Sequence, residues 1–150
     1  ALIVRQEGNN AQTHPFVSVY EAYKKNGPNV LGVEALQGDD DCIGVKVNTA
    51  DGYADYLFSA TDMQAHHPSK RVSFCGGLGL IREKEGQIQL MYLGCGRSLK
   101  KGNFVLESDH DVYAAIYMQH GAWYYSATGP VRVKIGKETK ELNEGYNQKL

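Results

Sequence analysis

IGVKVNTADGYADYLFSA, residues 43–60, is the stretch that decides the fold. Aliphatic residues alternate with polar or small ones over residues 43–47, and this period of two is typical of a strand with one buried face. Residues 48–52 contain Asn, Asp and Gly, which accept left-handed backbone angles, so they predict a hairpin loop. Residues 53–60 then return as the second strand. We expect this hairpin at the centre of an antiparallel sheet, with neighbouring strands on both sides.

Short runs of β-branched and aromatic residues, separated by turn residues, continue through the rest of the chain. Such spacing predicts an all-β fold, an antiparallel two-sheet β-sandwich, formed as one domain over residues 1–150. The polar C-terminal residues 144–150 are expected to fray. We expect further strands at residues 1–6, 15–23, 30–37, 71–74, 78–84, 87–93, 112–119, 131–135 and 138–142.

Glycines divide the second half of the chain. Gly76-Gly77 indicates a bend or bulge, Glu85-Gly86 a tight turn, and residues 94–96 a break. Between the last two, residues 87–93 alternate, which places Ile88, Leu90 and Tyr92 on the inward face.

Net charge and hydropathy argue against nucleic-acid binding and against a membrane-spanning segment. The chain has 16 basic and 17 acidic residues, so its net charge is −1 and no basic excess exists to bind a phosphate backbone. No apolar run approaches the ~20 residues needed to cross a bilayer. We therefore expect neither nucleic-acid binding nor a membrane span. Cys42, Cys75 and Cys95 cannot all pair within one chain, and buried free thiols or one disulfide remain the alternatives.

Several of these segments together resemble a known domain. In order and spacing they are similar to the C-terminal β-domain of heparinase II/III-type polysaccharide lyases and their relatives among alginate and other uronate lyases. The resemblance spans about the first hundred residues. The segments are an Arg-x-x-Gly stretch, PFVSVYE at 15–21, VKV at 45–47, ADG at 50–52, DYLFS at 55–59, FCGGLGLIR at 74–82 and MYLG at 91–94.

The resemblance implies a division of labour. Such lyases place a helical toroid, which carries the catalytic tyrosine, before a large antiparallel β-sandwich, and 150 residues without a long amphipathic helix cannot supply that toroid. The chain would then be the C-terminal part of a larger, secreted or periplasmic protein. It would pack on an upstream helical catalytic domain and wall a cleft for an acidic polysaccharide. No residue matches a catalytic position, so β-elimination is not expected from this chain alone.

An aromatic cluster is the candidate for carbohydrate binding. Trp123, Tyr124 and Tyr125, with His120 nearby, could stack on the flat faces of sugar rings. The competing interpretation is core packing, in which alternation buries Trp123 and Tyr125 and leaves Tyr124 outside.

Three residues are candidate metal ligands. His66, His67 and Asp62 carry imidazole and carboxylate groups of the kind that zinc prefers, although a loop with solvated histidines explains the same residues. The clusters 109–111 (DHD) and 39–41 (DDD) read more simply as polar turns than as sites for zinc or calcium. No cofactor is therefore expected, with zinc or calcium as the exceptions to test.

Three functions remain open from these observations. The first is the non-catalytic domain of a lyase, the second a stand-alone carbohydrate-binding module, and the third a structural assembly domain whose exposed aromatic residues meet a partner chain.

Overall fold

The computed structural model describes residues 18–21, 27–36, 41–69 and 71–150. All regular structure in these ranges is β-strand, and every pairing is antiparallel, which confirms the all-β prediction. No helix long and apolar enough to span a bilayer occurs in these ranges. The strands are β1 (Val30–Leu36), β2 (Cys42–Thr49), β3 (Tyr53–Ala60), β4 (His67–Pro68), β5 (Ser73–Lys84), β6 (Gln87–Lys101), β7 (Phe104–Gln119), β8 (Ala122–Ala127), β9 (Val131–Ile135), β10 (Glu138–Leu142) and β11 (Gly145–Lys149).

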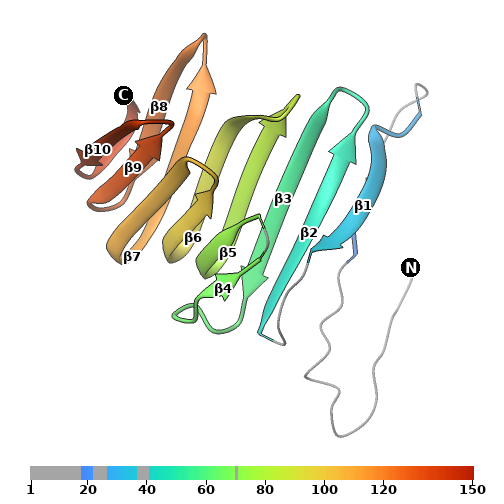
Figure 1. Ribbon diagram of the computed structural model, residues 1–150, viewed down its shortest axis with the longest axis horizontal. Helices are drawn as coiled ribbons and strands as arrows, with labels where there is room; N and C mark the ends of the chain where they lie inside the picture. Colours follow the sequence, from blue (N-terminus) through green and yellow to red (C-terminus); the bar gives the residue numbers. More distant parts are fainter. Residues whose placement is uncertain (1–17, 22–26, 37–40, 70) are drawn as a thin grey trace, which may run out of the picture.

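The described strands join a single 11-stranded sheet (Figure 1). Its main order is β1-β2-β3-β5-β6-β7-β8-β11, with β4 attached to β5 and the β9–β10 hairpin attached to β7. The β2–β3 hairpin forms as expected and has neighbours on both sides. It lies toward the β1 edge, however, because the long strands β5, β6 and β7 occupy the middle.

The long strands β5 and β6 continue through the glycines that the sequence pattern treats as a bend and a break. The β5–β6 pairing shifts register at Cys75/Gly76, and the β6–β7 pairing shifts on both sides of Gly96, so bulges bend the strands without ending them. Gly76 faces Gly96 across the ladder, and a Cβ on Gly96 would lie 2.6 Å from the Gly76 Cα. Only glycine permits this close approach at the bend.

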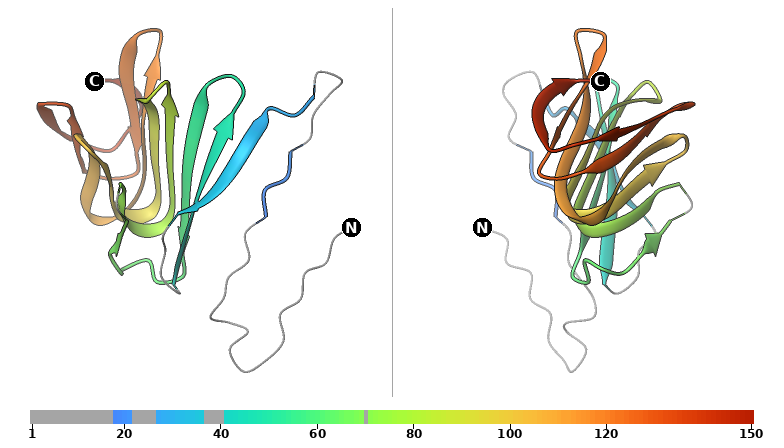
Figure 2. Two further views of the ribbon diagram at one scale, coloured as in Figure 1. Left: turned by 45° about the vertical axis from the view of Figure 1, so that its right-hand side comes forward. Right: turned by 90° about the vertical axis from the view of Figure 1, so that its left-hand side faces the viewer.

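The bend folds the sheet into two limbs, and Figure 2 shows the ends of β5, β6 and β7 curling back. Residues after the bend in β5 and before it in β6 belong to the long limb, together with β2, β3 and β8. The other ends, with β9 and β10, form the short limb. Phe58 on the long limb contacts Phe74 on the short limb, with ring centroids 5.7 Å apart.

The hydrophobic core lies between the two limbs. One cross-strand row, Phe74-Leu99-Leu106-Val133, comes from the short limb, and a second, Tyr56-Ile81-Met91-Ile116, from the long limb. All of these side chains are buried in one cluster. Two layers thus face each other, but they are limbs of one sheet, and two separately bonded sheets are not seen among the described strands.

Three local expectations are corrected. The strand expected at 15–23 is absent from its described part, residues 18–21, where Val19 and Tyr20 are exposed. Residues 144–150 do not fray as a whole, because β11 pairs with β8. Leu90 and Tyr92 face away from the core, because a bulge between Arg82 and Glu83 shifts the pairing and turns Met91 and Leu93 inward instead. The expected strand at 1–6 lies outside the described residues.

Candidate functional site

The predicted aromatic cluster is divided between two faces of β8. Trp123 and Tyr125 pack against the core, and the Trp123 ring lies 5.8 Å from that of Phe104 on the short limb. Tyr124 points to the opposite face and stacks on Tyr117 at 6.1 Å. His120 is exposed in the β7–β8 turn with a φ of 49°. These four residues do not form one platform, and sugar binding by any of them stays a prediction.

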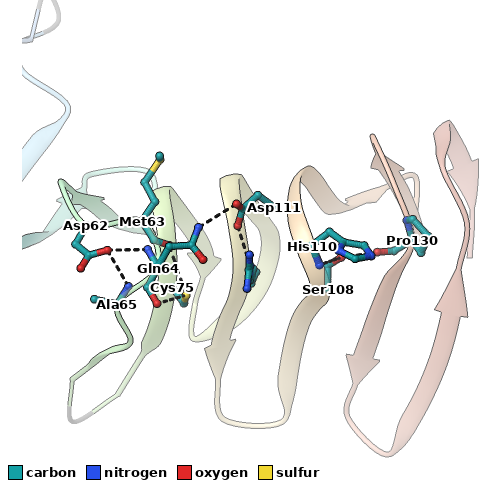
Figure 3. Close-up of polar contacts among 10 residues, drawn as sticks. Asp62, Met63, Gln64, Ala65, Cys75, Ser108, His110, Asp111 and Pro130 are labelled. Atoms are coloured by element: carbon teal, nitrogen blue, oxygen red, sulfur yellow. Dashed lines mark hydrogen bonds and ion pairs between the residues drawn. The ribbon is translucent and has the colours of Figure 1, made fainter.

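The predicted metal ligands do not converge on one point. The Asp62 carboxylate accepts hydrogen bonds from the backbone N–H groups of Gln64 and Ala65, at 3.0 and 3.2 Å (Figure 3). His66 Nε2 lies 2.9 Å from the Ser73 hydroxyl, whereas His67 is buried with its Nε2 3.2 Å from the Asp62 carbonyl oxygen. Over the described part of the chain, no group of three or more His, Cys, Asp or Glu could hold a metal ion.

Residues of the neighbouring strands form hydrogen bonds with the loop at 62–65 (Figure 3). Gln64 Nε2 donates to Asp111 Oδ2 at 3.0 Å, and Arg97 Nε lies 3.0 Å from Asp111 Oδ1. The Gln64 hydrogen bond first, and Arg97 second, hold the pKa of Asp111 below its ordinary value. The Cys75 thiol donates to two carbonyls of the loop, and burial raises its pKa. The Asp-His-Asp stretch at 109–111 thus contributes a loop anchor.

No disulfide joins Cys75 and Cys95: both are free thiols, and Cys75 is buried. Of the acidic stretch at 39–41, only Asp41 lies in the described residues.

A face that the sequence analysis missed lies on the outer side of the long limb. The cross-strand row opposite the core side runs Ala35-Val45-Leu57-Leu80-Tyr92-Ala115, and we call it the back face. Leu57 is 36% exposed, and nearby Leu78 and Val33 are 46% and 50% exposed. The back face is therefore apolar, although it is not part of the core cluster.

The back face has an aromatic end. There a groove of about 640 Å³ is lined by small residues, including Ala115 and Ser126, and by Tyr92, Tyr113 and Tyr146. Tyr113 and Tyr146 are strongly exposed. The sequence contains a signal for this second apolar face. In LMYL, residues 90–93, both the odd-numbered and the even-numbered residues are apolar, which is typical of a strand covered on both faces.

A second groove lies where the free ends of the two limbs approach each other. This mouth groove has a volume of about 740 Å³. Its apolar side is lined by Phe104, Met118 and Trp123, while Arg71, Lys101 and Glu83 supply its charges. Lys101 Nζ lies 2.6 Å from the Glu83 carboxylate and 3.4 Å from the centre of the Tyr56 ring. These residues come from distant parts of the sequence, so no local motif marks the groove.

Comparison with known proteins adds two findings. The family described as "Endo-acting ulvan lyase C-terminal domain" matches residues 30–118. An endo-acting ulvan lyase of Formosa agariphila is 33% identical over 114 residues, which are 72% of this chain and 14% of that relative. The chain thus spans about a seventh of the length of that curated protein. No solved structure matches the chain.

Proposed function

Because this chain belongs to the family of endo-acting ulvan lyase C-terminal domains, we propose that it is the assembly domain of a polysaccharide lyase. In this role the back face packs against the part of the enzyme that carries the catalytic residues. The domain itself breaks no bond, and it helps to wall the cleft that holds the polymer.

The back face is the observation that carries the proposal. When one face of an antiparallel sheet is open to water, apolar and polar residues usually alternate along its strands, so that only the buried face is apolar. Here both faces of the long limb carry aliphatic and aromatic side chains, but only the inner face has a partner layer among the described residues. A contiguous exposed apolar surface of this kind marks a protein contact. Burying the part of Leu57 that is still exposed, 36% of the residue, would contribute about 0.5–1 kcal/mol.

The form of the partner follows from the resemblance to heparinase II/III-like lyases. In those enzymes a helical toroid bears the catalytic tyrosine, and we propose that a domain of that kind covers the back face. A lyase of this class acts by β-elimination, in which a base removes the proton next to a carboxylate. The substrate is then an acidic polysaccharide, and the enzyme acts where that polymer occurs, outside the cytoplasm, as a secreted or periplasmic protein.

Charge placed on the back face tests the assembly role. In the lyase polypeptide that carries this domain, Leu57→Glu puts a carboxylate in the middle of the proposed contact. Limited proteolysis should then release the domain from the catalytic part faster, and the thermal transitions of the two parts should separate. Thr139→Glu places the same charge on the exposed strand β10 of the short limb and serves as the matched control. Equal proteolysis and a single shared transition in both variants would count against the proposal.

A further inference from the structure

We propose that the mouth groove is a binding subsite for a carboxylate-bearing sugar of an acidic polysaccharide. The class of ligand rests on the proposed function, whereas the location rests on the groove itself. The mouth groove opens between the limbs, so it remains accessible when the back face is covered.

The apolar side of the mouth groove suits a pyranose ring. Trp123 contacts Phe104 on one side, and the same indole lines the groove together with Met118. Sugars present flat C–H surfaces that stack on such rings, and a few polar groups around an apolar wall then fix the orientation of the ligand. The indole Nε1–H finds no acceptor within the described residues and is available to a hydroxyl group.

The polar side of the mouth groove suits a carboxylate. Arg82, Arg97 and Arg132 each bind a carboxylate of this chain. Arg71 has no such partner in the described ranges, and it lines the groove with an exposed side chain. A guanidinium with a free planar edge binds a carboxylate through two parallel hydrogen bonds.

Lys101 supplies a second, fixed positive charge. Its ion pair with Glu83 uses one of three N–H donors, and both side chains are mostly buried, so the ammonium group is held in place. With Arg71, Lys101 and Glu83 as its charged groups, the lining carries a net charge of +1. Amides of Gln87, Gln89 and Asn103 also line the groove and can bind sugar hydroxyls.

A competing groove lies on the outer side of the short limb, and its charges fit a polyanion less well. It contains Arg97, Lys100 and Arg132, but each of these cations already binds Asp111, Glu107 or Glu141. An incoming carboxylate would have to displace an internal one. Of these two grooves, it is the mouth groove that combines a guanidinium without a carboxylate partner among the described residues with the aromatic rings of Phe104 and Trp123.

The test is titration of the full 150-residue chain with ulvan, followed by calorimetry and by the ligand-induced rise in Tm. Carboxyl-reduced ulvan serves as the ligand control. Arg71→Gln should weaken binding about tenfold, which is the loss of one charge-assisted hydrogen-bonded contact. Lys137→Gln removes an exposed positive charge in the β9–β10 turn and should leave the affinity unchanged. Trp123→Phe keeps a ring against Phe104, and it should weaken binding to ulvan and to its reduced form alike.

Three results would overturn the inference: no binding of ulvan by the folded wild-type chain, equal binding of reduced and unreduced ulvan, or equal affinities for Arg71→Gln and Lys137→Gln. Circular dichroism confirms that each variant is folded. The assembly role is tested separately by Leu57→Glu, which leaves the mouth groove intact. Ulvan binding that persists in Leu57→Glu, combined with proteolysis no faster than in the Thr139→Glu control, would remove the assembly role and keep the subsite.

Discussion

Gly96→Ala should destabilise the domain, because Gly96 is buried at the bend and an added methyl group has no room there. The added Cβ would lie 2.6 Å from both the Gly76 Cα and the Cys75 carbonyl oxygen, and 2.8 Å from Leu93 Cδ1. Non-bonded carbon atoms prefer a separation of about 3.5–4.0 Å. Two of the three close atoms belong to the backbone, so no side-chain rotation relieves the clash, and strands β5 and β6 must move apart at the bend.

The expected loss of stability in Gly96→Ala follows from the cost of overpacking a filled site. Inserting a methylene group into a filled site costs about 1–3 kcal/mol and occasionally more, and the backbone contacts here place the value at about 3 kcal/mol. For a domain of this size, that loss lowers Tm by roughly 6–12 °C.

Urea unfolding followed by the fluorescence of Trp123, the only tryptophan, measures this change directly. Trp123 is a suitable reporter because it contacts Phe104 across the two limbs. Gly32→Ala is the matched control, since an added Cβ there meets no atom within 4 Å, and its effect should stay within about 1 kcal/mol. If the two variants unfold at the same urea concentration, the strands do not approach at Gly96 as described.

Three further outcomes are expected. Leu99→Ala removes a fully buried side chain between the limbs and should cost about 2–5 kcal/mol in the same urea assay. Lys101→Met leaves the Glu83 carboxylate without its 2.6 Å partner and should lower stability by about 2 kcal/mol, a loss that Glu83→Gln in the same chain should largely restore. The hydrogen bond from Lys100 lowers the pKa of Glu107 from 4.5, so its stabilisation is present above pH 4.5 and is lost as the pH falls through the folded-state pKa; Glu107→Gln should therefore flatten the acid limb of a plot of unfolding free energy against pH.

The sequence predicts what is local. The β2–β3 hairpin and the turn at Glu85-Gly86 form where alternation and turn residues place them, because their signals lie within a few residues of each other. The preference for a strand over a helix at residues 112–119 is also confirmed by β7. In each case the backbone pairing and the side-chain pattern agree.

The features that depend on whether a strand continues past a glycine could not be predicted from the sequence. A bulge and the end of a strand leave the same glycine signature. The bulge expected at Gly76-Gly77 is confirmed by the register shift there, whereas the break expected at residues 94–96 is wrong, because β6 runs on through Gly96. One extra residue near Gln89 is enough to invert the face of every residue that follows, which is why Tyr92 was assigned to the wrong side. The mouth groove depends on the same bend, since only the bend brings Lys101 back to Glu83.

The shared strands restrict how this domain can change in length. The three long strands run through both layers, so an insertion or deletion inside β5, β6 or β7 displaces side chains in both layers at once. The two-residue turn between β5 and β6 lies at the rim, where Gly86 has no atom within 4 Å of an added Cβ. Length variation among homologues, and fusion sites chosen by engineers, should accordingly concentrate at such rims and avoid the strand interiors.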